Sequence, residues 1–142
     1  MAKKPNAQWP AHHLAAAELC RQGYVVASTM GNTPTADLMV GKPDGTSMFW
    51  VDVKGLANGK AFLVKAKPPH ENLFYVLVLV GKERGNDRFF VLSQEQFNGL
   101  IRGQEQSDVA KGNKPLPGFV WPAYKCFEDK WSVLPGWSAS SI

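Results

Sequence analysis

The part of this chain best suited to chemistry is an acid-x-lysine pair that is preceded in the sequence by another acidic residue. Asp52 and Lys54 lie in the stretch FWVDVKG, and Asp37 lies earlier, in the stretch TADLMVG. Because a β-strand sends alternate side chains to opposite faces, Asp52 and Lys54 would emerge side by side on one face. The apolar residues that alternate with them would then hold the other face of the strand against a core.

The turn between the two acidic stretches indicates how they meet. Residues 42–47, KPDGTS, join the apolar run of residues 36–41 to the alternating strand. Strands paired through such a turn would bring Asp37 next to Asp52. Two carboxylates and one ammonium group converging there predict a divalent-metal site with a lysine beside it, because Mg²⁺ takes oxygen ligands from one or two carboxylates. The alternative is a surface ion pair, which contributes little to stability.

These residues and their surroundings resemble the PD-(D/E)xK nuclease superfamily, whose members share the restriction-endonuclease-like fold. Asp37, Asp52 and Lys54 match the order and approximate spacing of the family motif, and the resemblance covers roughly residues 11–102. Two positions depart from the motif, because Ala36 stands where the family has proline and the second acid is aspartate rather than glutamate. The flanking segments that carry the resemblance are, in order, an Ala-rich helix, GYVVAS, GNTPTADLMVG, VDVKG, FYVLVLVG and RFFVLSQEQFNGLI.

The resemblance implies a fold and an activity. The expected fold is α/β, with a small mixed central sheet flanked by helices, a restriction-endonuclease-like α-β-β-β-α-β core and a C-terminal extension. The expected activity is hydrolysis of nucleic-acid phosphodiester bonds by a metal-activated water, with DNA as the favoured substrate. Mg²⁺ is the expected cofactor, and Mn²⁺ can substitute because it also favours oxygen ligands. The backbone carbonyl of Val53 would be a third metal ligand, and Lys54 would contact the attacking water or the scissile phosphate.

Four further charged residues are candidates for the site. Glu18, on the first helix, would reach the metal directly or through water, as a helix glutamate does in some relatives; the alternative is a solvated helix residue. Lys60, Lys65 and Lys67 follow the motif and could neutralise a nucleic-acid backbone beside the metal. Lys65 and Lys67 share parity on a strand predicted over residues 61–67. A solvated charged edge is the alternative for these lysines.

Turn residues, capping signals and hydrophobic periodicity predict the elements around the site. Residues 73–80 are apolar on both parities, which is typical of a central strand covered on both faces. Ser93 and Gln96 resemble a capping box that opens a helix. The predicted order is helix 11–22, strand 24–28, loop 29–35, the two acidic strands, strand 61–67, strand 73–80, strand 88–92, a helix to about Arg102 and a long loop over 103–122.

Length and composition predict one domain. The 142 residues divide into a core at about 11–102 and a tail, 103–142, whose aromatic residues suggest that it packs on the core. A formal charge of +4 permits a polyanionic partner but does not demand one. Cys20 and Cys126 have no metal-binding spacing and are predicted to be free thiols in a reducing cytoplasm. The sequence shows no signal peptide and no run long enough to span a bilayer, so a cytoplasmic protein without a membrane partner is expected.

Two other functions remain open. A non-catalytic module built on the same fold could bind nucleic acid or a protein, and a structural or interaction protein could keep only the scaffold. The intact set of Asp37, Asp52 and Lys54 argues against a decayed site. The small size, with no appended recognition domain, favours a homodimer or a partner chain that supplies specificity.

Overall fold

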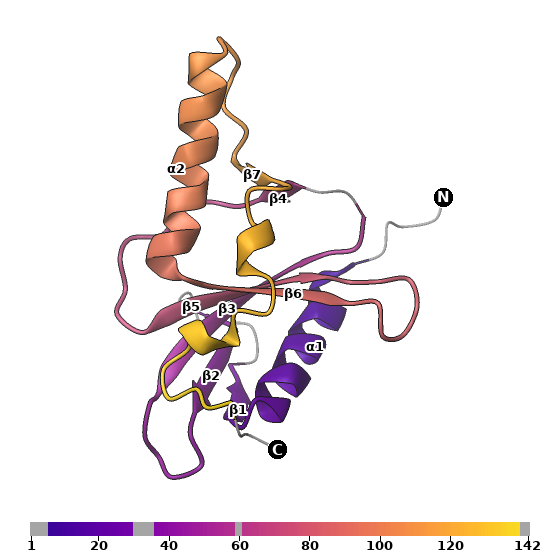
Figure 1. Cartoon of the computed structure of the whole chain (residues 1–142), viewed down its shortest axis with the longest axis vertical. Helices are drawn as coiled ribbons and strands as arrows, with labels where there is room; N and C mark the ends of the chain where they lie inside the picture. The colour runs from indigo at the N-terminus through magenta and orange to yellow at the C-terminus, as the bar shows by residue number, and fades with distance from the viewer. Residues whose placement is uncertain (1–5, 30–35, 59–60, 140–142) are drawn as a thin grey trace.

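A five-stranded mixed sheet lies at the centre of the molecule, with strand order β1-β2-β3-β5-β6 (Figure 1). The computed structural model describes residues 6–29, 36–58 and 61–139. The predicted α/β class and the mixed sheet are confirmed. The elements are α1 (Gln8–Arg21), β1 (Val25–Ser28), β2 (Leu38–Gly41), β3 (Phe49–Leu56), β4 (Ala61–Leu63), β5 (Leu73–Leu79), β6 (Arg88–Ser93), α2 (Gln94–Ala110), β7 (Gly118–Val120) and the 3-10 helices η1 (Lys125–Phe127) and η2 (Trp131–Val133).

The central sheet combines antiparallel and parallel pairs. Strands β1, β2 and β3 form an antiparallel meander, β5 runs parallel to β3, and β6 is antiparallel to β5. As predicted, β5 is a central strand whose apolar side chains are covered on both faces. The register between β3 and β5 aligns Asp52 with Tyr75 and Lys54 with Leu77. Since aligned residues point the same way, these four side chains share one face of the sheet.

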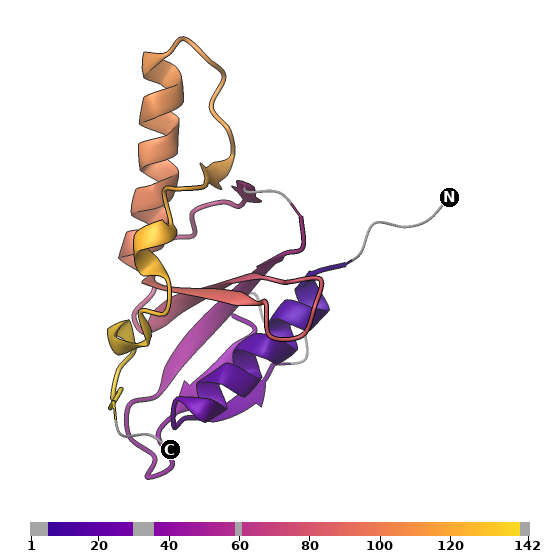
Figure 2. The ribbon, with the colours of Figure 1, turned by 45° about the vertical axis from the view of Figure 1, so that its right-hand side comes forward.

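The two faces of the sheet carry separate hydrophobic cores. On one face, Ala11, Ala15 and Leu19 of α1 pack against valines of β3 and β5. On the other face, Phe97 of α2 stacks on Tyr75 of β5, with ring centroids 3.7 Å apart. The predicted helix on each side of the sheet is therefore confirmed. Figure 2 shows α1 lying along the sheet, whereas α2 extends beyond it.

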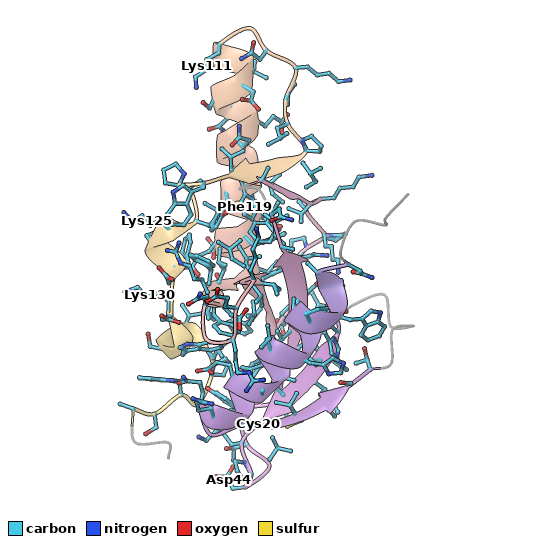
Figure 3. The ribbon with its side chains drawn as sticks, turned by 90° about the vertical axis from the view of Figure 1, so that its right-hand side faces the viewer. Cys20, Asp44, Lys111, Phe119, Lys125 and Lys130 are labelled. Carbon is cyan, nitrogen blue, oxygen red and sulfur yellow. The ribbon has the colours of Figure 1, made fainter. Side chains whose placement is uncertain are left out.

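The second helix is longer than predicted. It continues to Ala110, so the long loop predicted from residue 103 is wrong in its first part. The polar composition of residues 103–110 suggested a loop, but this half of α2 projects from the body (Figures 1 and 2). A helix that is largely surrounded by solvent can be polar on all sides. Ser93 and Gln96 form the predicted capping box at its start, and Figure 3 shows Lys111 at its far end.

Strands β4 and β7 form a separate two-stranded sheet. The strand predicted over residues 61–67 is therefore wrong in its extent, because β4 ends at Leu63 and its partner comes from the tail. Gly118 is needed in β7 for two reasons. Its φ of +136° disfavours other residues, and a Cβ there would collide with the carbonyl oxygen of Phe62.

The expected α-β-β-β-α-β order of the core elements is not confirmed. In the described part of the chain, β4 stands between β3 and β5, and α2 follows β6. Pro68 and Pro69 account for part of this difference, because proline inside a helix removes a hydrogen bond and clashes with the preceding turn. The connection from β3 to the parallel β5 is therefore made without a helix in its described residues, 57–58 and 61–72.

The tail packs back onto the domain, as predicted. Phe119 and Tyr124 are fully buried beside Phe62 and Phe97 in the core under α2. Trp131 packs in the other core, with its ring 5.8 Å from that of Phe89. Figure 3 shows Phe119 in the middle of the molecule, among the side chains that join the tail to the sheet.

Two further expectations concern the thiols and the membrane. Cys20 and Cys126 are free, as predicted, and both are exposed. Across residues 6–29, 36–58 and 61–139, no helix combines the length and the apolar character needed to cross a membrane.

Candidate metal centre

The two acidic residues meet where β2 and β3 separate. The strands pair from Val40 and Phe49 as far as Leu38 and Val51, and Asp37 stands just before β2. At that point, the side chain of Asp37 replaces a partner strand, because its Oδ2 accepts a hydrogen bond of 2.7 Å from the backbone N–H of Val53. The predicted hairpin is therefore confirmed.

Helix α1 covers the rest of this edge of β3. The Gln8 side chain acts as a peptide group would, because its Nε2 donates to the Val53 carbonyl at 2.8 Å and its Oε1 accepts from the Gly55 N–H at 3.3 Å. The helix can approach this closely only over glycine. A Cβ at Gly55 would lie 2.5 Å from the Ala11 Cβ and 2.6 Å from the Ala7 carbonyl oxygen. The Val53 carbonyl keeps a second lone pair, so it can still act as a ligand.

Asp52 is paired with two lysines. The carboxylate belongs to a residue that is only 3% exposed, and it lies on the face of the sheet that α2 covers. Lys54 Nζ lies 3.4 Å from Asp52 Oδ1, and Lys67 Nζ lies 2.6 Å from Asp52 Oδ2. Both lysine side chains are about one-third exposed, at 33% and 34%. The predicted neighbourhood of Asp52 and Lys54 is confirmed, whereas the contact with Lys67 is new.

Gln94, the first residue of α2, holds the segment that carries Lys67. Its buried side chain donates to the carbonyls of Lys67 and Pro68 at 3.4 and 3.1 Å and accepts from the His70 N–H at 2.7 Å. Asn98, one turn later, also donates to the Lys67 carbonyl at 3.4 Å. In the sequence, Gln94 is only one residue of the capping segment, and nothing there indicates that it contacts residues 67–70.

Burial raises the pKa of Asp37 above its ordinary value of 3.8, and the negative charge of Asp52 raises it further. The hydrogen bond from Val53 and the charge of Lys54 act in the opposite direction but do not cancel these effects on the Asp37 pKa. The lysines neutralise Asp52 directly, whereas Asp37 has no ion pair at salt-bridge distance among the described residues. The pair of carboxylates therefore carries negative charge that a cation would relieve.

The structure does not bring every predicted site residue together. Glu18 lies on the α1 side of the sheet, 3.7 Å from Arg21 and hydrogen-bonded to Gln22, away from Asp52. Lys65 is exposed in the segment after β4, so it does not form a row with Lys67 on a strand. Lys60 lies outside the described residues.

The residues present fit a magnesium ion with a small number of protein ligands. Asp37, Asp52 and the Val53 carbonyl are all oxygen donors, which is the donor set that Mg²⁺ prefers. Within the described residues, no group of three or more His, Cys, Asp or Glu side chains is arranged so that it could hold a metal ion. A site with two carboxylates suits Mg²⁺, because this ion retains several waters instead of taking a full set of protein ligands.

The hydroxyl of Tyr75 leads to a prediction about stability. Tyr75 is fully buried, and its hydroxyl has no hydrogen-bond partner among the described residues. Burial and then the charge of Asp52 raise its pKa, so the hydroxyl stays protonated. Tyr75→Phe is expected to raise the free energy of unfolding by about 1 kcal/mol, because it removes an unsatisfied polar group without changing the ring.

Denaturant unfolding measures this effect, and Tyr24→Phe is the matched control. The Tyr24 hydroxyl donates to the Pro135 carbonyl at 2.8 Å, so its loss should lower the free energy of unfolding by about 1 kcal/mol. A destabilised Tyr75→Phe protein would show that the Tyr75 hydroxyl has a stabilising partner.

No protein-family model, curated protein sequence or solved structure matches this chain. Its function is therefore inferred from the site itself. That site contains two carboxylates, Asp37 and Asp52, and two ammonium groups, Lys54 and Lys67, beside the middle strand of a mixed sheet, where β2 and β3 separate.

Proposed function

We propose that this chain is a metal-dependent nuclease of the PD-(D/E)xK type, which hydrolyses phosphodiester bonds in nucleic acid, with DNA as the favoured substrate. The observation that carries the proposal is the meeting of Asp37 and Asp52 where β2 and β3 separate, with Lys54 on the same face as Asp52. Carboxylates that share residual negative charge beside a lysine are suited to bind a divalent ion and a phosphate together.

Each residue has a distinct role in the proposed reaction. Asp37, Asp52 and the Val53 carbonyl would hold Mg²⁺. When bound, the ion supplies an activated water and neutralises charge on the phosphate. Lys54 keeps its ammonium beside Asp52 and would donate a hydrogen bond to the attacking water or to a phosphate oxygen. Lys67 adds a second positive charge beside Asp52, which would stabilise negative charge that develops as the bond to the leaving oxygen breaks.

The proposal includes the restriction-endonuclease-like core. An antiparallel hairpin that carries both acids, followed by a parallel strand, supports it. Helix α2 covers the face of the sheet from which Asp52 and Lys54 emerge, although it follows β6 in the chain. A mixed sheet hosts many activities, so the fold alone does not decide the function.

The contact between Lys67 and Asp52 favours a second candidate function. Both oxygens of Asp52 face a lysine, so the charge of Asp52 is compensated without a metal ion. In a non-catalytic module, Asp52 would be a buried anchor that presents Lys54 and Lys67 to nucleic acid or to a protein partner. Such a module would bind equally well with and without a divalent ion.

Incubation with nucleic acids separates the two functions. The purified protein is mixed with plasmid, linear duplex, branched DNA and single-stranded RNA in Mg²⁺, Mn²⁺, Ca²⁺ or EDTA. Cleavage of at least one DNA in Mg²⁺ and Mn²⁺, but not in EDTA, is expected. Ca²⁺ should bind without supporting turnover, because the ion is larger than Mg²⁺ and its coordination geometry is less strict. If all four substrates remain intact in Mn²⁺, the nuclease proposal fails.

Lys54→Ala tests the role of the lysine. We expect cleavage to fall about 10²–10³-fold, the usual loss when one donor that stabilises transition-state charge is removed. Metal binding should persist, because Lys54 is not a ligand. Lys130→Ala is the matched control, since Lys130 is an exposed lysine on the tail (Figure 3). Full activity of Lys54→Ala, measured by single-turnover cleavage, would exclude the lysine from the mechanism.

A further inference from the structure

A cavity opens on Asp37, separate from the contacts of Lys54 and Lys67. It has a volume of about 490 Å³ and lies between the start of α1 and the end of β1. Its lining includes Trp9, His12 and His13 from α1, Ser28 from β1 and Asp37. Ligand sites in proteins have volumes of about 300–1,000 Å³. One proposed metal ligand therefore forms part of the wall of a cavity of ligand size.

An exposed indole forms one side of this cavity. Trp9 is 57% exposed and belongs to neither of the two hydrophobic cores. It stands in the first turn of α1, on the helix whose residue Gln8 is bonded to β3. A large apolar ring that is fixed on a helix but contributes to no core is available for a ligand.

Two histidines set the position of the indole. The Trp9 ring lies 6.2 Å from that of His13, at an interplanar angle of 26°, and 5.7 Å from that of His12, at 62°. His12 is buried, and its Nε2 lies 3.0 Å from the Ser28 Oγ, a hydrogen bond that ties α1 to β1. The indole is thus supported from beneath while much of its surface faces solvent.

We propose that this cavity binds an unpaired nucleobase, stacked on Trp9, next to the phosphate that the Asp37–Asp52 site attacks. This inference rests on the proposed nuclease function and specifies its substrate class. Aromatic side chains bind the faces of bases with little dependence on sequence, because every base has a π-face. In a duplex those faces are covered by neighbouring base pairs, so the substrate is single-stranded or locally unpaired nucleic acid. The exposed polar groups that line the cavity, among them His13 and Ser28, can contact the edge of the base.

Binding in Ca²⁺ tests the inference without requiring turnover. The probes are short DNA strands that each carry one 2-aminopurine at a different position, either single-stranded, fully paired or unpaired at that position only. Stacking on Trp9 should quench the fluorescence of the 2-aminopurine at one position in the single-stranded and locally unpaired probes. Trp9→Ala should abolish this quenching and weaken affinity about 5- to 150-fold, whereas Trp9→Phe should retain most of it.

Val109→Ala is the matched control, because Val109 is an exposed apolar residue near the far end of α2. It should bind every probe as the wild-type protein does. Equal affinity of the wild-type and Trp9→Ala proteins for the unpaired probes overturns the inference, as does a loss that is equally large for the paired probe or a failure to bind any probe. Cleavage in Mn²⁺ is recorded separately. Quenching that depends on Trp9, in a protein that cleaves no substrate, supports the base site and excludes the nuclease function. Cleavage that is unchanged in Trp9→Ala, without such quenching, supports the nuclease function and excludes the base site.

Discussion

Asp52→Asn is expected to reduce cleavage by roughly three orders of magnitude, because several kcal/mol of transition-state stabilisation depend on the metal and each 1.4 kcal/mol changes the rate tenfold. The substitution keeps the volume of the side chain but removes one of two carboxylates. It also removes the charge that holds Lys54 and Lys67 in place. No other single change in the described site affects the metal and both lysines together.

Asp44→Asn provides the matched control for Asp52→Asn. Asp44 lies at the tip of the β2–β3 hairpin, at one end of the molecule (Figure 3), and the substitution changes the net charge by the same amount. Single-turnover cleavage and Mg²⁺ titration by calorimetry should give wild-type values for this control. The free energy of unfolding of Asp52→Asn should fall by about 1 kcal/mol, since the two lysines are partly exposed and can turn to water. If the folded Asp52→Asn protein cleaves within tenfold of the wild type, Asp52 is not a metal ligand.

Asp37→Asn is expected to weaken Mg²⁺ binding while it stabilises the fold. Burial and the charge of Asp52 raise the pKa of Asp37 above 3.8, so the folded state binds this proton more tightly than the unfolded chain does. Between pH 3.8 and the raised pKa, the contribution of Asp37 to stability therefore falls as the pH rises. The amide is neutral at every pH and can still accept the hydrogen bond from Val53. The melting temperature at neutral pH should rise by roughly 3–5 °C, which corresponds to about 1 kcal/mol.

Thermal unfolding measured as a function of pH, with and without Mg²⁺, checks this prediction. Mg²⁺ should raise the melting temperature of the wild-type protein, because a ligand that binds only the folded state stabilises it, and should leave Asp37→Asn unchanged. Asp44→Asn is again the control, because the contribution of Asp44 to stability depends on pH with the opposite sign. Hydrogen bonds from Thr46 lower the pKa of Asp44, so the Asp44 carboxylate contributes stability that is lost as the pH falls. An Asp37→Asn protein that is less stable than the wild type at neutral pH would contradict the repulsion between the two carboxylates.

The parts of the site that were predicted from the sequence are those that depend on local pattern. Alternation in the stretch around Asp52 predicts the face on which Lys54 emerges, and the turn at residues 42–47 predicts the hairpin partner. Both follow from the period of two along a strand and from contacts between neighbours in the chain. The apolar segment of β5 is predicted for the same reason, because burial on both faces leaves no polar position.

The parts that were missed depend on contacts between distant residues. The sequence predicts Lys67 on a strand beside a nucleic-acid backbone, but its ammonium contacts Asp52 in a segment whose carbonyl at Lys67 is bound by Gln94 and Asn98. No periodicity in residues 64–70 encodes a contact with a helix that begins at Gln94. The true end of α2 was missed because the helix stands clear of the body, so no apolar stripe marks its last turns.

The pairing of β4 with β7 also sets the order in which the site can be assembled during synthesis. The hairpin with Asp37 and Asp52 is complete once β3 has been made. Among the strands that the structure describes, however, β4 pairs only with β7, and the N–H of Val64 donates to the carbonyl of Pro117. At about 5–20 residues per second, the ribosome adds β7 seconds after the segment that carries Lys67. Until then, the growing chain holds the acidic hairpin without the strand that pairs with β4. A chain released before Gly118 would therefore carry both carboxylates with β4 unpaired, and α2 alone would hold the segment that carries Lys67.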